Sequence, residues 1–237
     1  MRPFSHDLPG MLKVHILSLF PDAIEAYLKT SILGRAQDND LLQVHVLDFR
    51  KFAKGNRRNV DDRPYGGGPG MILKPEPIFS AIEWVESNFG PTHKILLTPD
   101  GTPFKQSHAE NLLNHKKDLL LLCGRYEGFD ERIRQGFDFT EISIGDYILC
   151  GGEIAALAII EATTRLIPDA LGHEESAIQE SFSGELLDYP NYTRPPEFRG
   201  MRVPEILLSG DHLKVKKWRY DKALEKTKER RPDLLDH

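Results

Sequence analysis

The chain has 237 residues, of which 40% are hydrophobic and 28% are charged. This composition is typical of a soluble globular protein with enough apolar material for one large domain or two smaller ones. No apolar run approaches the roughly 20 residues that span a bilayer, so the composition argues against an integral membrane protein. The two cysteines, Cys123 and Cys150, have no metal-ligand spacing and favour a reduced, cytoplasmic setting.

The net charge of −5 gives no overall sign of nucleic-acid binding, but the basic residues are concentrated in two segments. Residues 50–63 contain six Lys or Arg against two acids, and residues 214–231 contain nine against three. A solvated surface and a footprint for a phosphate backbone both explain such clusters. The sequence leaves both interpretations open.

Residues 1–10 lack the apolar centre of a signal peptide, and we expect them to be a disordered extension. Beyond them, short apolar runs alternate with helical patterns, which predicts a layered α/β domain with a largely parallel sheet. The predicted strands are residues 14–19, 42–47, 94–98, 119–123 and 141–144. The predicted helices are residues 22–37, 75–89, 105–114, 129–135 and 152–167, the last ended by Pro168.

The composition changes after Pro168. Residues 169–196 contain six acids and one Arg, with repeated Gly, Ser and Pro and no apolar period, which predicts a flexible acidic linker. Beyond the linker, residues 211–231 have the pattern of a long charged helix. We therefore expect a first domain of residues 1–168, the linker, and a small helical domain of residues 197–237.

Three glycine-rich segments contain the candidate chemistry: DDRPYGGGPGM (residues 61–71), GRYEGFDER (residues 124–132) and SIGDYILCGGE (residues 143–153). The first lacks the GK[ST] of a P-loop and fits either a mobile surface loop or a lid or wall for a substrate. The other two each follow a predicted strand, and open α/β sheets bind ligands at the carboxyl ends of strands. Glycine there lets backbone groups approach a small polar ligand closely. The three acids of GRYEGFDER fit either a metal or acid–base cluster or a helix cap.

These three segments are followed by SFSGELLDYPNYTRP (residues 181–195) and by VPEILLSGDH with a downstream KKWR (residues 203–219). In this order the motifs closely resemble the bacterial TrmD family, the tRNA (guanine-N1)-methyltransferases of the SPOUT superfamily. The resemblance extends from Met11 to the C-terminus. It implies an α/β fold of the SPOUT type, with a trefoil-knotted, largely parallel sheet flanked by helices and a small helical C-terminal domain that binds tRNA.

The resemblance also implies that the knotted loops bind S-adenosyl-L-methionine. Backbone groups of glycine-rich turns suit the polar groups of such a ligand, and apolar residues suit its ring. The family leaves Mg²⁺ open as a second cofactor, for which we assign no ligand. Mapped onto this sequence, the cofactor-binding residues are Thr98, Pro99, Gly124, Tyr126, Glu127, Ile144, Gly145, Asp146, Tyr147, Ile148, Leu149, Gly151 and Gly152.

Members of this family methylate N1 of the guanosine at tRNA position 37, which requires a general base for the N1 proton and a cation near O6. Where the family typically has Asp before Ser-Phe, this sequence has Glu180, which we expect to be the base, with Asp188 as the second candidate. Arg165 corresponds to the arginine assigned to O6, although by itself it equally fits an ion pair with Glu161 on the same helix. The predicted substrate-binding residues are Asp61, Gly70, Asp188, Lys216, Lys217 and Arg219.

Two subunits form each active site in this family: one contributes the cofactor knot, and the other contributes the tail domain and part of the linker. We therefore expect a cytoplasmic homodimer with shared active sites that acts on tRNA and needs no membrane. Two other functions stay open. One is a SPOUT ribose 2′-O-methyltransferase, although such enzymes lack the SFSGELLDYPNYTRP linker. The other is a tRNA-binding homologue whose catalysis is impaired by Glu180.

Overall fold

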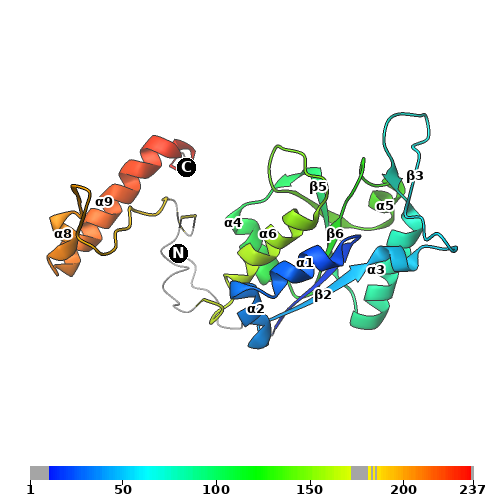
Figure 1. Ribbon diagram of the computed structural model, residues 1–237, viewed down its shortest axis with the longest axis horizontal. Coiled ribbons are helices and arrows are strands. Elements are labelled where there is room, and N and C mark those ends of the chain that lie inside the picture. The colour runs from blue at the N-terminus through cyan, green and yellow to red at the C-terminus, as the bar shows by residue number, and fades with distance from the viewer. Residues whose placement is uncertain (1–10, 172–180, 183, 185, 236–237) are drawn as a thin grey trace. The chain divides into compact units, whose positions relative to one another are not determined.

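The computed structural model describes residues 11–171, 181, 182, 184 and 186–235, so the expected extension at residues 1–10 lies outside it. The chain divides into two compact units, residues 1–172 and residues 173–237 (Figure 1). The first unit contains a central sheet with helices on both faces, and the second is built mainly around one long helix. No helix in the described ranges is both long enough and apolar enough to span a membrane.

A five-stranded sheet forms the centre of the first unit. Its strands are β1 (Leu12–Ser18), β2 (Leu42–Asp48), β5 (His93–Pro103), β6 (Leu119–Cys123) and β7 (Phe139–Ser143). The strands lie in the order β2-β1-β6-β5-β7, and every neighbouring pair is parallel. The five predicted strands and the parallel sheet are therefore confirmed.

Helices pack against both faces of this sheet (Figure 1). Their bounds are α1 (Pro21–Leu28), α2 (Ser31–Asp38), α3 (Pro75–Phe89), α4 (Gln106–Leu113), α5 (Glu131–Gly136), α6 (Glu153–Thr164) and the short 3₁₀ helix η1 (Phe49–Phe52). One apolar core lies under α1, α2, α4 and α6, and a second lies under α3, α5 and η1. Strand β6 contributes to both: Leu119, Leu121 and Cys123 belong to the first core, and Leu120 and Leu122 belong to the second. A strand buried on both faces explains why its sequence is apolar without alternation.

Strand β5 bulges at its carboxyl end. Leu97 and Thr102 both pair with Ile142 of β7, so residues 98–101 are extra in the ladder. Gly101 lies so close to the backbone of Ile142 that a side chain at this position has no room. Bulges re-aim side chains and are common beside active sites. This bulge takes residues 98–100 out of the pairing with β7, so that they lie beyond the last regularly paired residue, Leu97.

Two predicted helices differ from the structure. The pattern at residues 22–37 forms two helices, because the hydroxyl of Thr30 donates to the carbonyl of Tyr27 at 2.7 Å and the backbone of Thr30 is extended. Such a side-chain bond to the backbone competes with helix propagation. Helix α6 ends at Thr164 rather than Ile167, because the amides of Leu166 and Ile167 bond to the carbonyls three residues back, those of Thr163 and Thr164, in tighter turns. The helix predicted at residues 75–89 is confirmed at both ends.

The described part of the second unit contains α9 (His212–Arg230), which confirms the long charged helix, and four shorter elements. These are β8 (Glu197–Phe198), β9 (Met201–Arg202), α8 (Glu205–Leu208) and the 3₁₀ helix η2 (Pro232–Leu234), and none was predicted. The segment before them packs on α9: the Leu187 amide donates to Thr227 Oγ1 at 2.9 Å, and Lys226 Nζ donates to the Asp188 carbonyl at 2.8 Å. Part of the expected linker is therefore attached to the long helix.

A candidate ligand-binding cleft at the carboxyl ends of the strands

A cleft of about 490 Å³ lies at the carboxyl ends of β5, β6 and β7. Three segments line it: the bulge of β5 with its neighbours (residues 97–100), the loop after β6 (residues 124–129), and the end of β7 with the loop after it (residues 142–145 and 147–152). Pockets of this volume suit a drug-sized ligand, and open parallel sheets bind ligands at this edge. The position agrees with the edge of the sheet that the sequence predicted.

The two glycine-rich loops are joined to each other through their backbones. The amide of Gly152 donates to the carbonyl of Gly124 at 3.0 Å, and Arg125 and Gly151 form an isolated antiparallel bridge. A Cβ on Gly152 would lie 2.8 Å from the Cα of Cys123 and 3.1 Å from the amide nitrogen of Gly124. Real side chains do not approach a backbone this closely, so glycine is required where α6 begins. Gly152 therefore permits the close packing of α6 against the end of β6.

Glu153, the first residue of α6, links these loops to the end of β1. Its side chain is 8% exposed, and its carboxylate accepts a hydrogen bond from Ser18 Oγ at 2.7 Å and pairs with Arg125 Nη2 at 3.1 Å. The guanidinium of Arg125 also lies over the ring of Phe20, 4.2 Å from its centre. A buried carboxylate needs such a cation and hydrogen-bond donors. Together these contacts hold one wall of the cleft against the sheet.

The DDRPYGGGPGM loop is fixed at its base next to the cleft. Its ends form a two-stranded ribbon, β3 (Asp61–Asp62) with β4 (Ile72–Leu73). The Glu127 amide donates to the Met71 carbonyl at 3.0 Å, and the Leu73 amide donates to the Gly128 carbonyl at 2.9 Å. At the other end of the loop, Tyr65 is 99% exposed. A fixed base with an exposed tip favours the lid or wall over an unattached surface loop.

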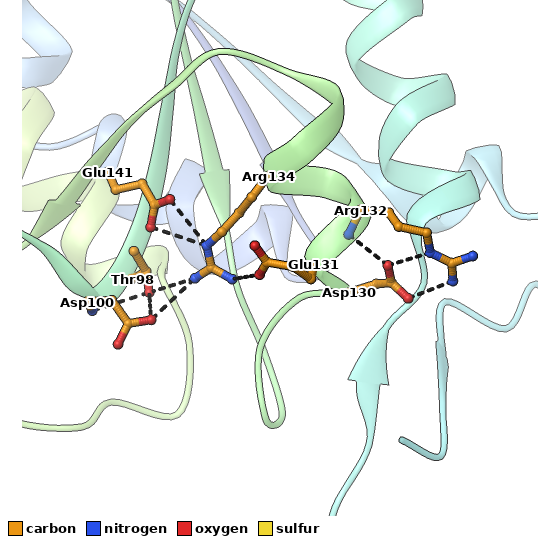
Figure 2. A network of polar contacts seen from close by, with 7 residues as sticks. All are labelled: Thr98, Asp100, Asp130, Glu131, Arg132, Arg134 and Glu141. Carbon is orange, nitrogen blue, oxygen red and sulfur yellow. Dashed lines mark hydrogen bonds and ion pairs between the residues drawn. The ribbon is translucent and has the colours of Figure 1, made fainter. Parts of the chain in front are cut away.

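A network centred on Arg134 of α5 closes a second side of the cleft (Figure 2). Its guanidinium donates to both carboxylate oxygens of Glu141 at 3.2 Å, to Glu131 at 3.3 Å and to Thr98 Oγ1 at 3.3 Å. It also contacts the carboxylate of Asp100 at 3.4 Å. One cation therefore joins the displaced end of β5 to α5 and β7. Sequence reasoning did not single out Arg134, because its partners come from three separate elements.

The acids of GRYEGFDER resolve into separate roles. Asp130 caps α5 by accepting from the Arg132 amide at 3.0 Å, and it holds the Arg132 guanidinium by two bonds of 2.7 Å (Figure 2). These bonds from Arg132 lower the pKa of Asp130 below its ordinary value. The helix-cap interpretation is confirmed for this residue. Across the described ranges, no group of three or more His, Cys, Asp or Glu side chains is arranged to hold a metal ion.

The structure brings together most of the residues that the resemblance assigned to the cofactor. Those that line the cleft are Thr98, Pro99, Gly124, Tyr126, Glu127, Ile144, Gly145, Tyr147, Ile148, Leu149, Gly151 and Gly152. Asp146 is not among the lining residues. The lining also includes Asp100, Arg125 and Cys150, which sequence reasoning did not assign. Arg125 lies inside the GRYEG motif, so the motif itself was the signal that could have found it.

Arg165, one of the two predicted catalytic residues, is not among the residues that line this cleft. Arg165 caps the carboxyl end of α6, thirteen residues beyond Gly152, which is about 20 Å along a helix at 1.5 Å per residue. The carboxylate of Glu161, its suggested ion-pair partner, accepts a hydrogen bond from the Tyr27 hydroxyl at 2.5 Å. Glu180 lies outside the described residues.

Two of the remaining predicted substrate residues flank the base of the first glycine-rich loop. Asp61 begins the β3–β4 ribbon. Gly70 has a φ of +78°, and its Cα lies against the side chain of Glu127, so this loop contacts the wall of the cleft. The loop and the cleft are therefore neighbours within the first unit.

The other predicted substrate residues belong to the second unit. Lys216 and Lys217 are exposed on α9. Arg219 lies over the ring of Tyr189 at 4.8 Å and lines a groove of about 530 Å³ together with Tyr192 and Trp218. The Asp188 carboxylate accepts a bond from the side-chain amide of Asn191 at 2.8 Å.

The fold is that of an α/β protein with a parallel central sheet, and its cleft lies at the carboxyl ends of the strands, where such sheets bind ligands. The particular family follows from comparison with known sequences. Residues 12–237 match the family described as tRNA (Guanine-1)-methyltransferase TrmD, and the chain belongs to this family.

Three curated relatives, each called tRNA (guanine-N(1)-)-methyltransferase, cover nearly the whole chain. The chain is 52% identical over 231 residues to that of an Anaeromyxobacter species, which covers 97% of this chain and 92% of the relative. It is 50% identical over 225 residues to that of Geobacillus kaustophilus and 49% identical over 225 residues to that of Brevibacillus brevis. In both of these comparisons the alignment covers 95% of this chain and 92% of the relative.

Proposed function

We propose that this protein is a cytoplasmic tRNA (guanine-N1)-methyltransferase that transfers a methyl group from S-adenosyl-L-methionine to N1 of the guanosine at position 37. The observation that carries the proposal is the convergence of three motifs of the family on one cleft. Both glycine-rich loops line the cleft, and the base of the DDRPYGGGPGM loop is hydrogen-bonded to one of them through Met71 and Glu127. A ligand in the cleft is thus next to the loop expected to contact the target base.

The lining of the cleft suits S-adenosyl-L-methionine. This molecule supplies an electrophilic methyl group on a positively charged sulfur. The apolar side chains of Ile144, Ile148 and Leu149 offer a surface for the adenine ring, and the glycine-rich backbone offers amides and carbonyls for the polar groups. The carboxylate of Glu127 lies on the same lining and favours a cation, whereas that of Asp100 contacts Arg134. A role for Mg²⁺ stays a prediction without an assigned ligand.

Catalysis needs two more groups, which we assign to Glu180 and Arg165. Guanine N1 carries a proton at neutral pH, so the Glu180 carboxylate takes this proton as general base while the Arg165 guanidinium stabilises the negative charge that grows on O6. Glutamate has one methylene more than the aspartate typical of the family, and a shift of about 1 Å at a catalytic group can lower the rate about 10²-fold. The proposed role therefore includes a compensating position of the linker backbone.

The position of Arg165 favours a shared active site. Because Arg165 and Gly152 lie at opposite ends of α6, about 20 Å apart, one chain does not bring this arginine to its own cleft. A homodimer in which each chain completes the cleft of the other removes this difficulty. In this arrangement residues 1–168 supply the knotted cofactor domain, and residues 169–196 and 197–237 supply the linker and the tRNA-binding domain.

The test uses purified protein, S-adenosyl-L-methionine and two tRNA transcripts that differ only in guanosine or adenosine at position 37. We expect 1-methylguanosine in digests of the guanosine transcript and no methylation of the other. A 2′-O-methylated nucleoside would instead establish the ribose methyltransferase. Methylation of both transcripts or of neither would refute the proposal, and tRNA binding without transfer would point to the impaired homologue.

The role of Glu180 has its own experiment. In single-turnover reactions with saturating tRNA, Glu180→Gln should lower the rate constant by at least about 10²-fold, since it removes a general base. Asp188→Asn is the matched control, because Asp188 is the second carboxylate candidate. Normal methylation by Glu180→Gln together with a slow Asp188→Asn variant would transfer the role to Asp188.

A further inference from the structure

Six basic side chains gather in the first unit, five of them between β2 and β3 and the sixth directly after β3. Five of them are exposed and one is half-buried, and they are Arg50, Lys51, Lys54, Arg57, Arg58 and Arg63. In the part of the chain that the structure describes, none of the six forms an ion pair with a carboxylate. Other cations of the same unit, such as Arg125 and Arg134, are held by acids. The whole chain has a net charge of −5, so this basic segment is a local exception.

The basic segment is anchored at both ends. At its start, Asp48 caps η1 by accepting from the Arg50 amide at 2.9 Å, and Phe49 is fully buried. At its far end, Val60 is buried, and its carbonyl accepts from the Lys74 amide at 2.8 Å. Between these anchors the chain turns at Gly55, which has a φ of +82°. Five of the six cations therefore lie on η1 or on a short loop between two anchored points, and Arg63 directly follows β3.

The segment is connected to a wall of the cleft. It includes β3, whose partner β4 is hydrogen-bonded to the loop after β6 through Leu73 and Gly128. Figure 1 shows β3 beside α3 and α5, with the chain projecting as loops before and after it. A polymer that placed one residue against the 61–71 loop would have its neighbouring residues beside these cations.

We propose that the basic segment, residues 50–63, binds the phosphates of the RNA strand next to the target base. Unpaired and exposed Lys and Arg release counterions from a phosphate backbone when they bind it, which is the dominant source of affinity in such surfaces. Arginine also contacts phosphate oxygens with two donors at once. The inference rests on the proposed function, since it takes tRNA as the substrate. It adds a phosphate-binding surface on the first unit to the one predicted on α9.

The experiment compares two double variants that each remove two exposed charges from a loop of the first unit. Arg57→Gln with Arg58→Gln changes the basic segment. Lys116→Gln with Lys117→Gln is the control. These lysines come just before the amino end of β6, whereas the cleft lies at the carboxyl ends of the strands. The dissociation constant of the tRNA transcript is measured between about 50 and 200 mM salt for both variants and for the unchanged protein. Thermal unfolding and S-adenosyl-L-methionine binding establish that each variant is folded.

The expected result is quantitative. Each phosphate contact contributes about 0.7 to 0.9 to the slope of log affinity against log salt, so the arginine variant should lower the slope by about 1.4 to 1.8. Its affinity at about 0.1 M salt should fall roughly 25- to 60-fold. The lysine control should keep the slope of the unchanged protein. An unchanged slope in the arginine variant, or an equal loss in the control, would overturn the inference.

Methyl transfer separates this inference from the proposed function. A protein that methylates position 37 while its arginine variant keeps the full salt slope would overturn the phosphate surface alone. Conversely, a protein that binds tRNA with the expected slopes but forms no 1-methylguanosine would overturn the proposed function and leave the phosphate surface standing.

Discussion

Replacing Glu153 by alanine should destabilise the first unit, because this carboxylate joins the loop after β6, the start of α6 and the end of β1. Its hydrogen bond from Ser18 at 2.7 Å and its contact with Arg125 at 3.1 Å are both lost in the variant. Removing one partner of a buried ion pair costs about 3–5 kcal/mol. The side chain of Arg125 is 25% exposed and stacks on Phe20, so the lower end, about 3 kcal/mol, applies.

Glu153→Gln is the matched control, since it keeps the volume and one oxygen acceptor. A hydrogen bond to a charged group contributes about 1.5–3 kcal/mol and a neutral one about 0.5–1.5 kcal/mol, so the glutamine variant should lose only about 1–1.5 kcal/mol. Both changes should weaken the binding of S-adenosyl-L-methionine, and alanine should weaken it more. The reason is that the bond from Gly152 to Gly124 depends on the fixed start of α6.

Urea unfolding measures these changes, and the two tryptophans allow each unit to be followed. Trp84 lies on α3 of the first unit and Trp218 on α9 of the second. In a Trp218→Phe background, fluorescence therefore reports the first unit alone, and the midpoint should shift while the slope with urea stays constant. Isothermal titration calorimetry gives the affinity for S-adenosyl-L-methionine.

A double-mutant cycle decides whether the ion pair is responsible. Arg125→Met removes the cation and keeps a long apolar side chain over Phe20. If the pair is responsible, the double variant should be less destabilised than the sum of the two single variants, by about 0.5–3 kcal/mol. Additive losses, or a Glu153→Ala variant within about 0.5 kcal/mol of the unchanged protein, would refute the reasoning.

Three further predictions concern the same unit. Gly152→Ala should destabilise it by about 1–3 kcal/mol in urea unfolding and weaken cofactor binding in calorimetry, because the new Cβ would lie 2.8 Å from the Cα of Cys123. Arg134→Gln should raise the KM for S-adenosyl-L-methionine several-fold with little change in the KM for tRNA, since it releases Thr98 from α5. Burial lowers the pKa of His15 below 6.5, so stability that is full above this pH should fall as the pH drops through the folded pKa. Urea unfolding from pH 8 to 5 should show a smaller loss in His15→Asn.

The sheet could be predicted from the sequence because each strand is a short apolar run between more polar segments. The run Leu119–Cys123 is apolar without alternation, and burial on both faces requires this pattern. The break in the helix pattern at Thr30 was missed, since a single hydroxyl bond to the Tyr27 carbonyl decides it. The bulge at residues 98–101 was missed for a different reason. It depends on the pairing of β5 with β7, which are far apart in the sequence.

In the site, too, some features depend on neighbouring residues in the sequence and others on residues far apart in it. Its glycines could be found from the sequence, since turns and close backbone approaches allow few other residues. The contacts that assemble it could not: Glu153 with Ser18 spans 135 residues, and Arg134 with Thr98 spans 36. Resemblance to a family supplied the ligand and the roles of residues, and the structure supplied the cleft that brings most of the proposed cofactor residues together.

The cleft is formed within one chain, whereas the proposed catalytic Arg165 lies away from the cleft of its own chain. The lining of the cleft consists largely of backbone and apolar groups that the first unit positions by itself, through Glu153 and Arg134. Arg165 lies at the far end of α6, so a single chain should bind S-adenosyl-L-methionine without being able to use it. Cofactor binding should then be independent of dimer formation, whereas methyl transfer should require the dimer. In the proposed dimer, such a separation would keep the reactive methyl group unused until tRNA and both subunits are in place.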